Sequence, residues 1–258
     1  MQDSWPSKTR RGFEPRLAAR ADRRSRWTRG SDLNQDRTVK TKYLAFNDSL
    51  YRYVCACRSN ADDPALAALE EKNDSLGEVT SKQQIGPDQG SFMTLLVAAI
   101  GATSAIEVGT FTGYSSICIA RGLREGGRLV CLDLNTEWAA IGRPYWKLAG
   151  VEDRIDFRPG PALETLRQLE PGLQFDFAFL DAEKTEYEAY YELILPRLRP
   201  NGLILFDNML WSGQVGSGAA LDPKGEAIDA LNRKLPNDPR VETMLLAIAD
   251  GILVCRKR

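Results

Sequence analysis

The sequence contains no histidine, and this absence excludes several classes of catalytic site. A Ser-His-Asp triad, a zinc or iron site with histidine ligands and a histidine general base all require the missing side chain. No two cysteines have the CxxC spacing that is typical of zinc sites. Any metal chemistry therefore has to use oxygen ligands or thiolates.

Long hydrophobic runs, internal repeats and low-complexity tracts are also missing. The longest apolar run covers residues 92–100 and is interrupted by Thr94, whereas a membrane span needs roughly 18 apolar residues. The five cysteines are odd in number, and Cys118, Cys131 and Cys255 lie inside apolar patterns. Buried free thiols in a reducing compartment explain these three better than disulfides do. We therefore expect a cytoplasmic globular protein without a membrane segment.

Basic residues are unevenly distributed along the chain. Residues 1–42 contain twelve Lys and Arg against five Asp and Glu, whereas the rest of the chain carries 22 basic and 30 acidic residues. Residues 1–42 also lack periodic hydrophobicity, which predicts a disordered extension. The acidic remainder, residues 43–258, is the expected folded domain, and its charge is not that of a nucleic-acid binder.

Three interpretations of the basic extension are open: an arm that binds RNA or a membrane, a targeting peptide, or a segment without function. No apolar stretch follows the arginines, so a secretory signal is not expected, and the acidic residues count against a mitochondrial presequence. Residues 12–15 read Gly-Phe-Glu-Pro, which the T-arm of a transfer-RNA gene could encode if read in frame. Our hypothesis is that the native chain starts downstream, near Val39.

From Tyr43 onwards, short apolar runs alternate with amphipathic helical patterns. Helices are expected around residues 44–54, 62–77 and 88–100, the second one capped by Asp62. Strands are predicted at 105–108, 129–132, 155–157, 175–180, 203–206, 244–248 and 252–255, with further helices at 115–124, 137–149, 162–170, 186–198 and 224–235. This alternation indicates a parallel sheet with helices on both faces. The last two strands are joined by residues 249–251, whose Asp-Gly favours a hairpin, so one antiparallel strand is expected at the end of the sheet.

A glycine motif connects the first predicted strand to the following helix. Gly109 and Gly113 are spaced as GxxxG, and glycines at such a turn let the backbone approach a ligand at the helix N-terminus. The close GxG pair of dinucleotide sites is missing. The motif therefore indicates a nucleotide-like ligand without a pyrophosphate, although such glycines can also serve the turn alone.

Asp133 follows the second predicted strand. An acid at this position is placed to accept hydrogen bonds from both hydroxyls of a ribose. The alternative is that Asp133 caps the next helix, a role that Asn135 or Thr136 can also take.

Two further acids end neighbouring predicted strands. Asp181 follows the run at 175–180, and Asp207 and Asn208 follow the run at 203–206. Ligands of open α/β sheets bind at the carboxyl ends of the strands, and two carboxylates with one amide oxygen suit Mg²⁺, Ca²⁺ or Mn²⁺. The sequence thus predicts a cation site, with helix capping or solvent exposure of these acids as the alternative.

With these motifs, residues 43–258 resemble the cation-dependent class I O-methyltransferases, the group that contains caffeoyl-CoA and catechol O-methyltransferases and many bacterial relatives. The matching segments are residues 107–115, 132–133, 160–163, 179–184, 207–213 and 232–235. The resemblance implies a Rossmann-like α/β fold with a seven-stranded, mostly parallel sheet. It also implies S-adenosylmethionine (SAM) as cofactor, a divalent cation, with Mg²⁺ expected first, and a homodimer. Residues 1–42 have no counterpart in the family.

The resemblance also assigns roles to single residues. The cofactor residues that it implies are Ile85, Glu107, Gly109, Thr110, Ser115, Asp133, Ala162 and Asp181, with Asp133 at the ribose and Ala162 at the adenine. The cation ligands that it implies are Asp181, Asp207 and Asn208. The loop around Ile85 lacks the usual methionine and hydroxyl residues, so a contact there has to be apolar or through the backbone. Glu183 stands where many members have Asp, outside this ligand set.

Methyl transfer to a hydroxyl requires an oxyanion, because the sulfonium methyl group is already electrophilic. A phenol has a pKa near ~10, and a bound cation lowers that pKa and positions the oxygen. Lys184 follows Asp181 by three residues and is the leading candidate for the catalytic base, since histidine is absent. The alternative for Lys184 is an ordinary solvated lysine at the start of a helix. Chelation through two vicinal oxygens favours small catechol-like or other phenolic acceptors.

Four aromatic residues flank the predicted site: Tyr187, Tyr190, Tyr191 and Trp211. Core packing is expected for most of them. Trp211, in a Ser-Gly loop, is the first candidate for stacking on an acceptor ring.

Three other functions are compatible with parts of this sequence. The same chemistry can methylate a hydroxylated uridine in transfer RNA, which the acidic domain disfavours unless the extension binds RNA. A SAM-binding protein without catalysis is disfavoured because the site residues are intact: Asp181, Lys184, Asp207 and Asn208. An NAD oxidoreductase is disfavoured by the missing GxG spacing.

Overall fold

The computed structural model describes residues 44–258, whose strands form one seven-stranded sheet. The predicted disordered extension at residues 1–42 and the predicted start near Val39 lie outside the described residues. The strand order is β3-β2-β1-β4-β5-β7-β6. The strands are β1 (Ser104–Val108), β2 (Arg128–Asp133), β3 (Ile155–Pro159), β4 (Phe175–Leu180), β5 (Leu198–Phe206), β6 (Val241–Leu246) and β7 (Ile252–Lys257).

β7 alone runs against the other strands, antiparallel to both of its neighbours, β5 and β6. The predicted mostly parallel sheet with one antiparallel strand is therefore confirmed. β7 lies one place in from the edge, because β6 pairs with its outer side. The strand order reverses between β1 and β4, and ligands of open α/β sheets bind at the carboxyl ends of the strands beside such a reversal.

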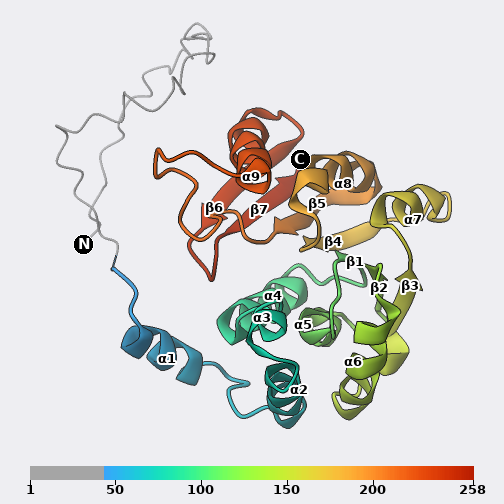
Figure 1. The fold of residues 1–258 in the computed structure, drawn as a ribbon. Helices are drawn as coiled ribbons and strands as arrows, with labels where there is room; N and C mark the ends of the chain where they lie inside the picture. The colour runs from blue at the N-terminus through green and yellow to red at the C-terminus, as the bar shows by residue number, and fades with distance from the viewer. Residues whose placement is uncertain (1–43) are drawn as a thin grey trace, which may run out of the picture. The chain divides into compact units, whose positions relative to one another are not determined.

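Helices cover both faces of the sheet, as predicted (Figure 1). The helices α2, α4, α5 and α6 pack on one face, and α7, α8 and α9 pack on the other. The α-helices are α1 (Asp48–Ala56), α2 (Pro64–Asp74), α3 (Glu78–Ser81), α4 (Pro87–Ala99), α5 (Tyr114–Gly122), α6 (Thr136–Leu148), α7 (Ala162–Gln168), α8 (Tyr187–Ile194) and α9 (Pro223–Lys234). Short 3₁₀ turns lie at η1 (Glu152–Arg154), η2 (Lys184–Glu186), η3 (Leu195–Arg197) and η4 (Leu235–Asn237).

The start of α2 lies one residue later than the predicted cap at Asp62. The Asp63 carboxylate accepts hydrogen bonds from the N–H groups of Ala65 and Leu66, each at 3.0 Å, and a proline occupies the first turn. This is the geometry expected of an acidic N-cap. The helix ends at Asp74 rather than at Gly77, which instead begins the separate short helix α3.

Two predicted boundaries near the C-terminus were wrong by several residues. The helix predicted at 186–198 ends at Ile194, because Pro196 lies in a 3₁₀ turn that leads into β5 at Leu198. The strand predicted at 244–248 is β6, at Val241–Leu246. Pairing with β7, rather than hydrophobicity, defines this half-exposed edge strand. The connection to β7 is therefore residues 247–251, longer than the predicted turn at 249–251.

The burial of three cysteines agrees with the expectation drawn from the sequence. Cys118, Cys131 and Cys255 are buried free thiols. Within residues 44–258, no helix is long and apolar enough to cross a membrane.

Candidate active site

The predicted cation ligands follow two strands that lie side by side in register. Leu180 of β4 pairs with Phe206 of β5, so Asp181 and Asp207 leave the sheet at neighbouring positions. The Asp181 N–H donates to the Val108 carbonyl at 2.8 Å, and the Asp207 N–H donates to the Leu180 carbonyl at 3.0 Å. The ladder of hydrogen bonds thus continues one residue past each strand and holds both acids at the same edge of the sheet.

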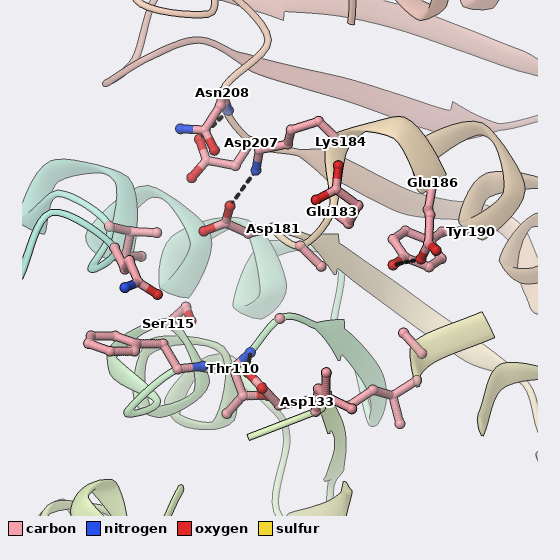
Figure 2. Close-up of a pocket in the computed structure, with 18 of the residues that line it drawn as sticks. Thr110, Ser115, Asp133, Asp181, Glu183, Lys184, Glu186, Tyr190, Asp207 and Asn208 are labelled. Atoms are coloured by element: carbon pink, nitrogen blue, oxygen red, sulfur yellow. Dashed lines mark hydrogen bonds and ion pairs between the residues drawn. The ribbon is translucent and has the colours of Figure 1, made fainter. Parts of the chain in front are cut away.

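A cavity of about 1330 Å³ lies at this edge. Of the predicted site residues, those that line the cavity are Ile85, Gly109, Thr110, Ser115, Asp133, Ala162, Asp181, Lys184, Asp207 and Asn208. Figure 2 shows Asp181, Lys184, Asp207 and Asn208 together at one end, with Thr110 and Asp133 at the other. Pockets for one drug-sized ligand span roughly 300–1,000 Å³, so the cavity has room for a nucleoside cofactor and a second ligand.

Gly109 is needed where the ends of β1 and β4 approach each other. It has φ +89°, and a Cβ atom on it would lie 2.0 Å from the carbonyl oxygen of Asp181. Gly113 has φ +84° and faces the Trp146 ring, which a Cβ atom would meet at 2.3 Å. Both glycines therefore serve the local turn, and Gly109 in addition lines the cavity.

Asp133 ties the turn after β1 to the end of β2. Its carboxylate accepts hydrogen bonds from the backbone N–H groups of Thr110 (2.8 Å), Phe111 (2.9 Å) and Asn135 (2.8 Å). The cap of α6 is the Asn135 side chain, not Asp133. A carboxylate has about four acceptor positions, so one is left for a ribose hydroxyl. For Asp133 to bind both ribose hydroxyls, as predicted from the sequence, one of its three hydrogen bonds from backbone N–H groups has to break.

Glu107 is the one predicted cofactor residue that does not line the cavity. It is fully buried on the α5 side of β1. Its Oε1 atom has no hydrogen-bond partner, and the same holds for the buried hydroxyl of Thr110 beside the cavity. Burial raises the pKa of Glu107 to about 7, against the opposing effect of the Ser115, Ser116 and Cys131 side chains. Unpartnered polar atoms under a cofactor-sized cavity are expected where a ligand completes their hydrogen bonds.

Lys184 is not the solvated lysine of the alternative interpretation, because it is only 8% exposed. Its Nζ donates to Asp181 Oδ1 at 2.8 Å and to the Tyr187 hydroxyl at 2.7 Å, and the first of these bonds is drawn in Figure 2. Tyr187 is in turn bonded to the Leu180 carbonyl at 3.0 Å. These contacts fix the amine at the end of β4.

Asp207 is 3% exposed. Burial, followed by the negative charge of Asp181, raises the pKa of the Asp207 carboxyl to about 7, while Gln89 and Lys184 act in the opposite direction. The next residue, Asn208, has φ +58°, a left-handed conformation that asparagine tolerates better than most residues. Asp181 and Asp207 carry two negative charges when ionised, and Lys184 supplies only one positive charge. The carboxylate oxygens and the amide oxygen of Asn208 are suitable ligands for a hard divalent cation.

The third predicted ligand of the cation is an amide oxygen. In the part of the chain that the structure describes, no three Asp, Glu or Cys side chains are grouped as metal ligands. The predicted set of Asp181, Asp207 and Asn208 therefore depends on the Asn208 side chain. Glu183 is occupied elsewhere, since it forms an ion pair with Lys224 at 2.9 Å.

Asp250 is a cavity residue that the sequence interpretation missed. The Asp-Gly at 250–251 was used only to predict a turn, whereas the Asp250 carboxylate accepts the Ser212 N–H at 2.7 Å. The Leu210 N–H donates to the Asp250 carbonyl at 2.8 Å. The Asn208 side chain is hydrogen-bonded to the Asp250 carboxylate. This bond lowers the pKa of Asp250, but burial has the larger effect and the pKa is raised overall. The residues after β5 are thus held against the β6–β7 connection. An acid next to a turn glycine gave no separate signal in the sequence.

The aromatic residues divide as expected. Tyr187, Tyr190 and Tyr191 are all buried in the core, and Tyr190 and Trp211 line the cavity. Trp211 has φ +48°, and its indole N–H donates to Asp222 at 3.0 Å.

Comparisons with known proteins agree with this geometry. The chain matches the model of the O-methyltransferase family over residues 57–258. It is 39% identical to tricin synthase 1 of Oryza sativa subsp. japonica over 240 residues, covering 86% of this chain and 92% of the relative. It is 36% identical to a caffeoyl-CoA O-methyltransferase of Eucalyptus gunnii, covering 85% and 91%. The solved O-methyltransferase from Bacillus cereus in complex with SAH is similar with a TM-score of 0.74 and 32% identity, covering 81% and 97%.

Proposed function

Because the chain belongs to the O-methyltransferase family and uses SAM as methyl donor, we propose that residues 43–258 methylate a small catechol-like acceptor with the help of a divalent cation. The observation that carries this proposal is the group of Asp181, Lys184 and Asp207 at adjacent strand ends, on the wall of a cavity with room for two ligands. Family membership also weighs against a SAM-binding protein without catalysis.

The cofactor end of the cavity is formed by the turns after β1, β2 and β3. SAM supplies an electrophilic methyl group on a sulfonium. Gly109 brings the backbone of this turn close to the cofactor, Asp133 accepts a ribose hydroxyl, and Ala162 meets the adenine at the start of α7. Ile85 adds an apolar wall from the loop before α4, where it is 7% exposed.

The acceptor end is formed by the residues after β4 and β5. A divalent cation held by Asp181, Asp207 and Asn208 would supply a Lewis acid that lowers the pKa of an acceptor hydroxyl. These three residues orient the acceptor by fixing where its two vicinal oxygens lie. Lys184, with Nζ held by Asp181 and Tyr187, takes the hydroxyl proton or steadies the resulting charge. Trp211 offers an aromatic face for the acceptor ring.

The acceptor class follows from the need for two adjacent oxygens. The relatives named above are a tricin synthase and a caffeoyl-CoA O-methyltransferase. Both names point to phenolic compounds, so a catechol-bearing phenol is the acceptor we propose for this chain.

The test is a methyl-transfer screen with the full chain, SAM, and a panel of catechols, flavonoids and hydroxycinnamoyl thioesters, each beside a matched monophenol. We expect methylation of the catechols and not of the monophenols. EDTA should reduce the rate to background, and Mg²⁺ or Mn²⁺ added in excess should restore it. Catechol methylation that EDTA leaves unchanged would exclude the cation, and a fold check by circular dichroism separates metal removal from unfolding.

A further inference from the structure

A group of polar side chains lies in the core directly beneath the cofactor end of the cavity. Glu107 on β1, Ser116 on α5 and Cys131 on β2 are each 0% exposed. Glu107 and Cys131 are register partners on the parallel strands β1 and β2, so their side chains lie side by side under α5. Burying a carboxylate is costly unless hydrogen bonds or a positive charge compensate for the lost water.

The two oxygens of the Glu107 carboxylate have different surroundings. Oε2 accepts the Ser116 hydroxyl in a short hydrogen bond and the Cys131 thiol at 3.3 Å. The Cys131 sulfur also lies 3.6 Å from the Ser116 oxygen, so the three groups contact one another. Oε1 has no partner. Donors from α5 and β2 thus hold the carboxylate through Oε2, and Oε1 makes no hydrogen bond within the described residues.

We propose that Ser116 and Cys131 are positioning residues for SAM binding, because they hold Glu107 so that its unpartnered oxygen is available to the ammonium group of the cofactor's methionine part. The inference rests on the assignment of the cavity to SAM. Two neighbours of Glu107 line the cavity: Gly109, two residues further along the chain, and Ser115, whose hydroxyl interacts with the Glu107 carboxylate.

The protonation state of Glu107 can be measured, and it would not change if Ser116 and Cys131 served only the packing of the core. The groups that shift the pKa of Glu107 are the hydroxyls of Ser115 and Ser116 from α5, the Cys131 thiol from β2, and the negative charge of Asp181, which directly follows β4. A cation arriving at Oε1 favours the ionised carboxylate, so cofactor binding near pH 7 should release a proton. Loss of either donor should raise the pKa of Glu107 in the free protein and increase this proton release.

The experiment measures binding of S-adenosylhomocysteine, which keeps the ammonium group, by calorimetry at pH 6.5–8 in buffers with different ionisation enthalpies. The dissociation constant should rise about tenfold in Ser116→Ala and about threefold in Cys131→Ala, as expected for loss of a hydrogen bond to a charged group and to a weaker donor. Proton release should be larger in both variants than in the wild type. Cys131→Ser restores a donor and should restore both quantities.

Cys255→Ala is the matched control, because Cys255 is a thiol of equal burial on β7 that does not contact Glu107. It should lower the melting temperature about as much as Cys131→Ala does and leave binding and proton release unchanged. Wild-type affinity and proton release in folded Ser116→Ala and Cys131→Ala would overturn the inference. Absence of binding in the wild type itself would instead contradict the assignment of the cavity to SAM.

Discussion

At the scale of single residues, Lys184 is the group that we propose takes the proton from the acceptor. Its amine is held by the Asp181 carboxylate and the Tyr187 hydroxyl, and its side chain is almost fully buried. Such constraints fix the direction of the amine relative to the cavity. A base held in this way acts on one acceptor position rather than on any hydroxyl that enters.

Lys184→Ala is therefore expected to lower kcat by about 10²–10⁴-fold, the usual range for loss of a general base. Affinity for S-adenosylhomocysteine should change little, because Lys184 is bonded to Asp181 and Tyr187 and not to the turns after β1, β2 and β3. Lys224→Ala is the control, since Lys224 also lines the cavity but pairs with Glu183, and its kcat should stay within about threefold of the wild type. An unchanged kcat in Lys184→Ala removes this residue from the mechanism.

Gly109 is the second residue whose identity the structure explains. Gly109→Ala adds a Cβ that would meet the Asp181 carbonyl at 2.0 Å and forces alanine to φ +89°. The expected loss of unfolding free energy is about 3 kcal/mol or more, from clash and backbone strain together. Gly126→Ala, at φ +73° with no atom within 4 Å of the new Cβ, should cost only the strain, about 1–2 kcal/mol. Chemical denaturation measures both, and equal losses would contradict the close approach of β1 and β4.

At the scale of elements, the segment after β5 is stabilised by the connection between β6 and β7. Asn208, Trp211 and Ser212 all have positive φ values, between +48° and +58°. Non-glycine residues adopt this conformation at a cost and keep it only where other contacts hold it. The contacts here include hydrogen bonds to residues 250–251, so the proposed ligand Asn208 depends on an element distant in sequence.

Asp250→Ala should loosen this segment without unfolding the sheet. We expect faster hydrogen exchange at the Ser212 amide and a roughly tenfold weaker binding of Mn²⁺, the scale seen when a residue that orients a metal ligand is lost. Asp250→Asn keeps an oxygen that accepts the Ser212 N–H and should preserve most of the exchange protection. If exchange at Ser212 is the same in Asp250→Ala as in the wild type, the segment is held by other contacts.

At the scale of the whole molecule, the buried Glu107 makes folding stability depend on pH. Its pKa is raised from an ordinary 4.5 to about 7. The folded state therefore holds the proton more tightly than the unfolded state, and this contribution to stability is complete below pH 4.5 and lost as the pH rises to 7.

Compared with Glu107→Gln, the wild type should lose about 3 kcal/mol of unfolding free energy between pH 4.5 and pH 7.5, the order expected for such a shift of a fully buried carboxyl. The difference between the two proteins, measured by urea denaturation at each pH, cancels the titration of the other acids. Saturating S-adenosylhomocysteine should reduce this loss in the wild type. A constant difference across the pH range would mean that Glu107 titrates normally in the folded protein.

Much of the fold could be predicted because its signals are local. Apolar runs mark β1, β2 and β4 in the sequence, and the buried sheet keeps them nearly continuous in the structure. Gly109 and Asp181 could be predicted as site residues because each directly follows an apolar strand, where a glycine or an acid contrasts with the residues before it. The boundaries that failed lie at Pro196 and at the edge strand β6, where a turn and strand pairing, rather than hydrophobicity, decide the outcome.

The sequence by itself determined the alternation of strands and helices, the absence of histidine chemistry, and which acids stand at strand ends, because each of these depends on neighbouring residues. Only the tertiary structure decided that Asp133 binds the turn after β1, that Asp250 holds the segment after β5, and that Ser116 and Cys131 converge on Glu107. These contacts join residues far apart in the chain. Their partners are set by strand order and register, which no local pattern contains.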